Sequence, residues 1–584
     1  MQSLPVKSPD RVAVSLHRVA WPLGCAAAAL AIATLPNVWA RLHFGSWFWI
    51  SDHDGWIYLQ VLAHAGPASP YPWLLFGPAR LAQRWLGWGP ARLTLAWSIQ
   101  AALLTALPLY CWLEGLLRDC LPNPAPQAAL LSLLFCFDTG VLHYFPVLRQ
   151  FAALWKLPLL LRQTYPHLLR QWNVLSPALW LGYLFLFLLL ERRAALHPAW
   201  RRKLAAMASL AALAYVYFYL WSAALVGLLL LALLDCFLPA AVNRSFSLLR
   251  CRLEIAAGGL LAGLPALIAG SQTMAAGWLS RNGLWVHRFR HEPFHAGNLL
   301  LYALTLIWIW RRERDLLPLW TTSLAAWLLF FFQPLLFGRE LQNFHWLYIR
   351  NPLLYLLWLL LAARAAARYN SRWGAAALAC LIGAMAVSGF YLRWRQADAS
   401  AGSLEAMRQW RAWTLSSPSP SPPRAAGMNV AAGNASYVRL AVIRAGWRPL
   451  SGDAVLLNPL VPSREWMART ALNLYLQAGP DPSAWHSAAL AWLRREGRLH
   501  SELPWTSVPA RRRRLLAHLR QNFIKIRRNP LPGLSLYQVG LIALPAGRPA
   551  PWLPPGWRRL ACSPSWQCWK APGAAAPLTT PRRH

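Results

Sequence analysis

Acidic side chains are scarce in this 584-residue chain, which has 20 aspartates and glutamates against 58 lysines and arginines. Cysteine is also infrequent, with 9 residues and no Cys-x-x-Cys pair. The chain has no phosphate-cradling glycine loop, no His-x-x-Glu-His zinc helix and no nucleophile elbow. The sequence therefore contains none of the motifs of a P-loop nucleotide binder, a zinc protease or an α/β-hydrolase.

The formal net charge of +38 suggests a nucleic-acid partner, but the distribution of the basic residues excludes one. Most arginines lie in short gaps between apolar runs of about 17 to 22 residues, the length that crosses a hydrocarbon core roughly 30 Å thick. Hydrophobic residues make up 57% of the chain. The sequence thus predicts an α-helical polytopic membrane protein.

About eleven apolar runs are long enough to be membrane spans. The first follows a basic leader with Lys7, Arg11 and Arg18, which keeps the N-terminus in the cytoplasm. Because residues 38–40 form a poor cleavage site, this run is interpreted as an anchor rather than a cleaved signal. The predicted spans are 21–39, 93–116, 126–146, 174–190, 204–220, 221–238, 254–271, 298–310, 316–336, 345–364 and 373–392.

The apolar stretch 204–238 fits either one long tilted helix or two helices that meet near residues 219–221. With two helices, four basic gaps all fall on the cytoplasmic side, as the positive-inside rule requires. With one helix, the last three gaps would lie outside, so we expect two. The gaps hold Arg192, Arg193, Arg201, Arg202 and Lys203; Arg244, Arg250 and Arg252; Arg311, Arg312 and Arg314; and Arg364, Arg368 and Arg372.

Basic residues also occur in the longer outer segments, against the same rule. They suggest either an anionic ligand at the outer face or contact with lipid headgroups. Two of these outer stretches, 72–88 and 148–169, mix arginines with aromatic and aliphatic residues. We expect both to form helices that lie in the membrane interface.

The apolar runs become shorter after residue 392. The Ser-Pro repeat at 416–423 predicts an extended linker, and an α/β domain of about 150 residues is expected beyond it. An odd number of spans places that domain outside, in the periplasm of a bacterium. Its predicted strands are 453–459 and 534–544, and its predicted helices are 463–477, 484–496 and 510–524.

Two features of this tail carry further predictions. Cys562 and Cys568 could form a disulfide in an oxidising compartment, or remain two free thiols. The arginine run 511–514 is expected on a solvated helix face, with an anionic membrane surface as its partner. The expected organisation is a cytoplasmic leader at 1–20, a transmembrane domain at 21–392, a helix and linker at 393–426, and a periplasmic α/β domain at 427–584.

The first candidate site lies directly after the first span, where Asp52 and Asp54 flank His53. Two carboxylates and an imidazole this close can bind a divalent metal, Mg²⁺ or Mn²⁺, or supply a general base. Charges at a membrane boundary cost free energy unless they are solvated or paired. The alternative is a solvated loop, or an internal salt bridge to Arg41.

The second candidate site lies at the outer junction of the ninth and tenth spans. If the tenth helix begins near Gln342, then Gln342 and His345 project near one side. A histidine with Arg339 nearby could hold a phosphate. The alternative is a helix cap with a surface pair between Arg339 and Glu340.

The third candidate site flanks the second outer segment. Arg149 and Arg170 carry planar, permanently charged groups that suit a phosphate or pyrophosphate, although headgroup anchoring accounts for either one alone. Asp138 inside a span is costly unless it is paired, and His143 is its nearest candidate partner.

The layout resembles the GT-C superfamily of membrane glycosyltransferases, which has a cytoplasmic N-terminus, an acidic first outer loop, many spans and an external C-terminal domain. Three short motifs are similar to bacterial members: Asp54-Gly-x-x-Tyr58, Arg170-Gln-Trp-Asn, and the segment 340–345, Glu-Leu-Gln-Asn-Phe-His. The chain lacks the Trp-Trp-Asp signature of oligosaccharyltransferase catalytic subunits and the Asp-Glu pair of protein O-mannosyltransferases.

The resemblance implies transfer of a sugar from a polyprenyl-phosphate donor to a glycan, lipid or protein acceptor at the outer face of the bacterial cytoplasmic membrane. Asp54 would be the general base of an inverting reaction, and Asp52 could bind a metal or orient His53. Donor binding and stabilisation of the leaving phosphate would fall to His53, Tyr58, His143, Arg149, Arg170, Arg339, Glu340, Gln342 and His345.

Two other functions fit the same layout. A lipid or glycan transporter or flippase would have internal repeats and interrupted helices, and no convincing repeat is evident. A non-enzymatic envelope-assembly protein would carry its function in the tail. The acidic first loop and the basic outer segments favour the enzyme.

Overall fold

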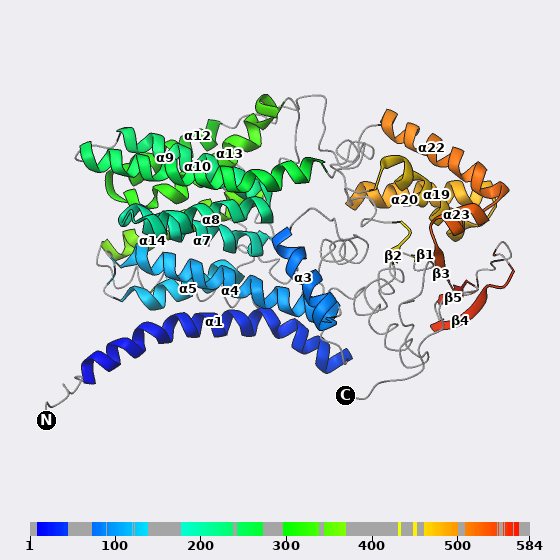
Figure 1. Cartoon of the computed structure of the whole chain (residues 1–584), viewed down its shortest axis with the longest axis horizontal. Coiled ribbons are helices and arrows are strands. Elements are labelled where there is room, and N and C mark those ends of the chain that lie inside the picture. Colours follow the sequence, from blue (N-terminus) through cyan, green and yellow to red (C-terminus); the bar gives the residue numbers. More distant parts are fainter. Residues whose placement is uncertain are drawn as a thin grey trace.

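The structure is a computed structural model of the whole chain. It describes residues 9–44, 73–88, 90–118, 121, 123–137, 177–237, 242–272, 296–337, 344–368, 376, 430–433, 448–451, 461–499, 509–545, 547, 550, 553, 555–563 and 566–571. These residues form a bundle of long helices and a smaller unit that contains a sheet (Figure 1).

Each of the first ten predicted spans overlaps an observed helix, and the eleventh, 373–392, lies almost entirely outside the described residues. A further helix, α3 (Trp73–Leu86), lies where an interfacial helix was predicted. The bundle helices are α1 (Pro9–Phe44), α4 (Pro90–Leu117), α5 (Pro124–Phe137), α7 (Pro177–Leu196), α8 (Trp200–Val216), α9 (Phe218–Phe237), α10 (Val242–Gln272), α12 (Ala296–Arg312), α13 (Leu317–Phe337) and α14 (Phe344–Arg368), with a 3₁₀ turn η3 (Arg314–Leu316) before α13.

Five of these helices contain stretches that are long and apolar enough to cross a membrane, so the structure is consistent with a helical multi-pass membrane protein. A shorter apolar stretch, Val19–Leu35, lies in α1. The membrane assignment rests on length and composition. The five stretches are Leu95–Leu117, Phe218–Phe237, Phe246–Ala269, Arg314–Gln333 and His345–Ala366.

Two separate helices cover residues 204–238, as the charge argument predicted. Helix α8 ends at Val216, and Tyr217 has an extended backbone before α9 begins. Lys203 near the start of α8 contacts Glu254 near the start of the span in α10, so these two helices run parallel. Asp235 at the end of α9 contacts Arg252 on α10, so α9 runs the opposite way. Helices α8 and α9 are therefore an antiparallel pair.

Side-chain contacts extend this alternation to the other helices. Arg192 near the end of α7 donates to the carbonyl of Gly115 near the end of α4 (3.0 Å). Arg364 near the end of α14 donates to Leu116 on α4 and to Asp315 in η3. One end of the bundle, named the charged end, thus holds the last residues of α4, α7, α9, α12 and α14, the first of α8 and α13, and Arg252 and Glu254 of α10. The opposite end is named the far end, and Figure 1 shows α1 running toward it from the N-terminus.

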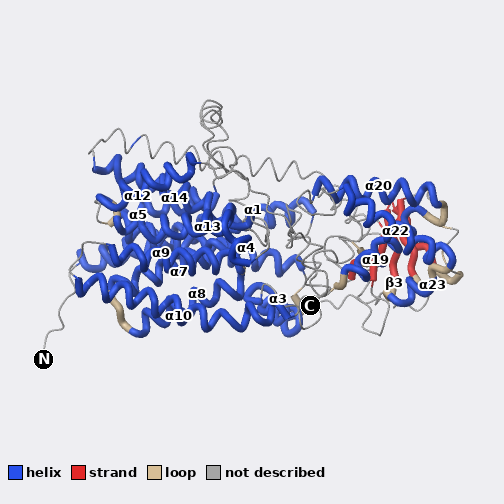
Figure 2. Tube along the Cα trace, turned by 90° about the horizontal axis from the view of Figure 1, so that it is seen from above, coloured by secondary structure: helices blue, strands red, loops and turns tan. Residues whose placement is uncertain are grey.

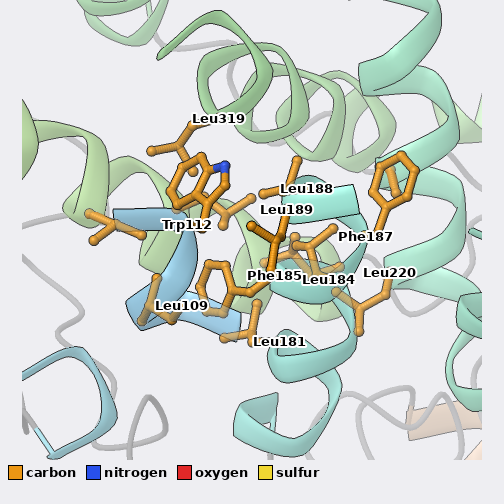
Figure 3. Close-up of a cluster of buried hydrophobic side chains, with 14 of the residues drawn as sticks. Leu109, Trp112, Leu181, Leu184, Phe185, Phe187, Leu188, Leu189, Leu220 and Leu319 are labelled. Carbon is orange, nitrogen blue, oxygen red and sulfur yellow. The ribbon is translucent and has the colours of Figure 1, made fainter. Parts of the chain in front are cut away.

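The bundle is held together by a dense apolar core from α4, α7, α9 and α13 (Figure 3). The ring centre of Phe185 on α7 lies 5.2 Å from that of Phe135, in an edge-on arrangement, and 6.5 Å from that of Trp112. Glycine permits the closest approaches: a Cβ built at Gly227 of α9 would lie 2.7 Å from the Cα of Thr322 on α13. Small residues at such crossings let membrane helices pack backbone to backbone.

The C-terminal unit contains a five-stranded sheet in the order β2-β1-β3-β5-β4. Strand β1 is parallel to β2 and β3, whereas β5 is antiparallel to β3 and β4. A core separate from that of the bundle forms between the sheet and its helices, which lie together beside it in Figure 2. The strands are β1 (Val430–Gly433), β2 (Arg448–Pro449), β3 (Val539–Pro545), β4 (Arg558–Ser563) and β5 (Trp566–Lys570); the helices are α19 (Ser463–Ala478), α20 (Pro482–Leu499), α22 (Pro509–Arg528) and α23 (Leu531–Leu536).

All three predicted helices of this unit are confirmed, but the strand prediction at 534–544 is wrong at its start. Residues 534–536 end helix α23, and the strand begins at Val539 after Gln538, whose φ is +53°. The side chain of Asn529 accepts the N–H of Leu531, and backbone bonds from Leu534 to Pro530 and from Tyr537 to Gly533 close helical turns that apolar alternation does not reveal. The other predicted strand, 453–459, lies outside the described residues.

Candidate functional site

The charged end contains a buried triad that joins three helices. Arg252 of α10 donates from Nε to Glu191 of α7 at 2.8 Å and from Nη1 to Asp235 of α9. All three residues are less than 9% exposed. Two carboxylates face one guanidinium, and Glu191 Oε2 has no hydrogen-bond partner in the described structure. Buried ion pairs add little net stability, but removing one partner is costly because the other charge is left buried without compensation.

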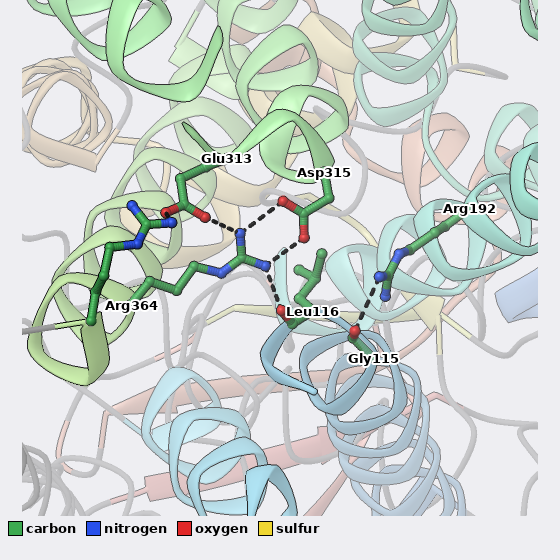
Figure 4. Close-up of polar contacts among 7 residues, drawn as sticks. Gly115, Leu116, Arg192, Glu313, Asp315 and Arg364 are labelled. Atoms are coloured by element: carbon green, nitrogen blue, oxygen red, sulfur yellow. Dashed lines mark hydrogen bonds and ion pairs between the residues drawn. The ribbon is translucent and has the colours of Figure 1, made fainter. Parts of the chain in front are cut away.

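A second arginine-centred cluster joins α14 to the α12–α13 connection (Figure 4). The Arg364 guanidinium contacts Glu313 at 2.5 Å and forms two hydrogen bonds with Asp315, at 2.7 and 2.5 Å. It also donates to the Leu116 carbonyl at the end of α4. Arg368 adds a contact to Glu313 at 2.8 Å. The two arginines balance the two carboxylates, and the cluster ties three segments together: α14, the α12–α13 connection and the end of α4.

The described bundle carboxylates between residues 73 and 368 are all engaged at the charged end. Besides the two clusters, Glu114 pairs with Arg118, and Glu254 pairs with Lys203 and Arg250. Carboxylate chemistry at the far end stays a prediction for residues outside the described part of the chain, namely Asp52, Asp54, Asp138, Glu292 and Glu340.

The far end contains an aromatic cluster around His345, in the first turn of α14. The imidazole stacks on Tyr219 with ring centres 4.6 Å apart and planes inclined by 16°. Tyr217 and Tyr348 also contact it, at 5.6 and 5.8 Å. Trp346 donates from its indole N–H to Ser222 at 3.0 Å, which binds α14 to α9. The histidine is thus held in a fixed position at the start of a helix, where backbone N–H groups favour anions.

Arg350, one and a half turns after His345, is a residue that the sequence pattern did not single out. It is fully buried and donates from Nε to the Tyr302 hydroxyl at 3.3 Å, with its guanidinium 5.7 Å from that ring centre. The Tyr302 hydroxyl lies 2.8 Å from Ser323 Oγ. The available signal was an arginine inside the apolar run 345–364, because ionisable residues within spans are rare and often functional.

Most predicted site residues lie outside the described residues, so their convergence stays a prediction. Of the candidate catalytic and phosphate-binding residues, only His345 is described with its side chain and surroundings. Asp52, His53, Asp54, Tyr58, His143, Arg149, Arg170, Arg339, Glu340 and Gln342 all lie in the segments 45–72, 138–176 and 338–343. The predicted metal site at Asp52 and Asp54 falls there too; in the part of the chain that the structure describes, no cluster of three or more His, Cys, Asp or Glu suits a metal ion.

The helix ends that flank these segments nevertheless share one location. Helices α5 and α13 finish at the far end, and α7 and α14 begin there, because each runs opposite to its neighbour in the chain. His345 and the segments that carry the other candidate residues therefore start from the same end of the bundle.

Cys568 in β5 is disulfide-bonded and buried. The strand register places Leu560 opposite Cys568, so position 562 is two residues further along the neighbouring strand β4. The Cys562 side chain lies outside the described residues, and its pairing with Cys568 stays a prediction. Four cysteines of the bundle, Cys25, Cys111, Cys236 and Cys251, are free thiols.

Comparison with known proteins assigns no family to this arrangement. The sequence matches no protein-family model and no curated protein. The functional argument therefore rests on the residues and the fold.

Proposed function

We propose that this protein is a membrane glycosyltransferase that transfers a sugar from a polyprenyl-phosphate donor to an acceptor at the outer face of a bacterial cytoplasmic membrane. The observation that carries the proposal is that the two ends of the bundle differ in the polar groups they hold. The described carboxylates are engaged in ion pairs at the charged end. The segments with the candidate base, metal-binding and phosphate-binding groups join helices at the far end, where the aromatic cluster around His345 lies.

The chemistry assigns a role to each group. Asp54 accepts the proton of the acceptor hydroxyl as that oxygen attacks the anomeric carbon, and the bond to the lipid phosphate breaks. Negative charge develops on the phosphate, where Arg149, Arg170 and Arg339 would stabilise it. His345 binds the same phosphate from the start of α14. Asp52 and Asp54 are the residues that would hold a divalent metal in a metal-dependent transfer.

Among the helices that the structure describes, the absence of an interrupted span favours an enzyme over a transporter. Helices α4, α10 and α14 contain Pro108, Pro265 and Pro352, yet each continues through its proline. The one-residue break at Tyr217 separates two antiparallel helices rather than dividing a single span. Transporters commonly place their substrate site at helices broken near the membrane midplane.

The test compares variants purified from native membranes, with bound lipids identified by native mass spectrometry and turnover measured with supplied donor. We expect Asp54→Asn to retain a polyprenyl-phosphate sugar and to lose at least about 100-fold in turnover. We expect His345→Gln to retain less donor, because a phosphate contact is lost. Glu114→Gln removes a half-buried carboxylate at the charged end that pairs with the exposed Arg118; it is the matched control and should behave as the wild type.

Two outcomes would contradict the proposal. One is that neither the wild type nor Asp54→Asn carries a glycolipid and supplied donors are not turned over. The other is that Asp54→Asn turns over donor at the wild-type rate, which would remove its role as the base. In the first case, transport of the lipid and binding of envelope partners become the functions to assay.

A further inference from the structure

Helix α22 of the C-terminal unit has one face buried in the unit's own core. Leu515, Leu519 and Phe523 are at most 6% exposed and recur every four residues along the helix. The Phe523 ring stacks on Trp485 of α20 with centres 4.5 Å apart and lies 6.3 Å from Tyr475 of α19. These contacts determine the rotation of α22, so the residues on its opposite face are held outward.

The outward face is basic over the whole length of the helix. The sequence of α22 contains no acidic residue, and none of its arginines forms an ion pair within the described structure. Arg527 lies near Asp481, whose pKa it helps to lower, so its charge is partly compensated. The other exposed basic residues of α22 and one exposed isoleucine form a surface named the basic face, which consists of Arg513, Arg514, Arg520, Ile524, Lys525 and Arg528.

An exposed aliphatic residue lies within this basic face. Ile524 is 46% exposed, and the 3.6-residue period places it between Arg513 and Arg528. Two more exposed leucines, Leu531 (48%) and Leu536 (71%), follow in α23. Arginines alone would suit any polyanion, whereas arginines combined with exposed aliphatic groups are typical of helices that lie in a membrane interface.

We propose that the basic face, together with Leu531 and Leu536, is a docking surface for a bilayer that contains anionic phospholipid. The basic groups contact headgroup phosphates, and Ile524 enters the boundary of the acyl chains. The chain that carries this surface also has apolar helices of spanning length, so a bilayer is held near it at high effective concentration. The inference does not depend on the proposed enzymatic function.

The experiment uses the full chain in nanodiscs of phosphatidylcholine, mixed with sedimenting vesicles of phosphatidylcholine alone or with about one-third phosphatidylglycerol. We expect binding to the anionic vesicles, weakened by salt. Arg513→Gln with Arg514→Gln should reduce affinity roughly 30-fold, as two surface arginines contribute about fivefold each. Arg558→Gln with Arg559→Gln removes the same charge from exposed positions of β4 and is the matched control.

Ile524→Asn separates a bilayer from a soluble polyanion. We expect it to weaken vesicle binding several-fold without any change of charge. A bilayer buries the aliphatic side chain among acyl chains, which stabilises the complex, whereas a soluble polyanion has no such apolar region. Circular dichroism checks that each variant is folded. Equal binding to both vesicle types, an equal loss in the β4 control, or a loss for the arginine pair with none for Ile524→Asn would each overturn the proposal, the last in favour of a soluble polyanion.

Discussion

Arg252 of α10 donates from Nε to Glu191 of α7 at 2.8 Å, across 61 residues of sequence and inside the helical bundle. The same guanidinium also holds Asp235 of α9. One side chain of α10 therefore joins the ends of α7 and α9.

Removing this arginine is expected to destabilise the bundle strongly. Arg252→Met should cost about 3–5 kcal/mol, because it leaves two carboxylates buried without a counter-charge. The triple variant Arg252→Met, Glu191→Gln and Asp235→Asn should recover most of that loss. Thermal unfolding in detergent measures both, with the exposed Arg250→Gln as the control. A single variant as stable as the wild type would contradict a buried triad.

The close packing of α9 against α13 at Gly227 predicts that a larger residue there destabilises the bundle. Gly227→Ala places a Cβ 2.7 Å from the Thr322 Cα, so α9 and α13 must separate, at a cost of about 1–3 kcal/mol. Gly24→Ala is the matched control, since nothing lies within 4 Å of its Cβ, and should be neutral or slightly stabilising. The unfolding midpoints of the two variants compare them directly, and equal midpoints would rule out the predicted close contact.

The hydrogen bonds of Asp481 predict that the stability of the first turn of α20 depends on pH. The Ser483 hydroxyl, with the backbone N–H groups of Ala484 and Ser483, lowers the pKa of Asp481 below its ordinary value of 3.8. A lowered pKa means that the cap stabilises the folded state above pH 3.8 and is lost as the pH falls through the lowered value.

Hydrogen exchange at the Ala484 amide tests this. Protection should be constant from pH 7 to about pH 5 and fall only under stronger acid. Asp481→Asn keeps an acceptor and should remove the acid dependence, whereas Asp481→Ala should exchange fast at every pH. Protection that falls near neutral pH would show that another group controls this turn.

The partner of Cys568 can be identified by peptide mapping under non-reducing conditions. We expect one disulfide-linked species that contains Cys562 and Cys568, because position 562 lies close along the neighbouring strand. Cys562→Ser should leave Cys568 as a free thiol that alkylates after unfolding. A cross-link from Cys568 to any other cysteine would refute this pairing.

The positions and directions of the bundle helices could be predicted from the sequence. A membrane requires apolar runs of a minimum length, and the basic gaps between them indicate which ends share a side. The same argument correctly divided residues 204–238 into α8 and α9. The start of β3 was not located, because the backbone hydrogen bonds that form the short helix α23 leave no sign in the pattern of apolar residues.

Which residues meet inside the bundle was decided only by the tertiary structure. Helices that are apolar on all sides have no face that predicts their neighbours, so the sequence did not reveal the Arg252–Glu191 pair, the Arg364 cluster or the contact of Arg350 with Tyr302. His345 was proposed from the sequence as a phosphate ligand, but its stacking on Tyr219 depends on how α14 and α9 cross. Sequence determines the elements and their direction through the cost of placing charge in the membrane, and tertiary packing determines their contacts.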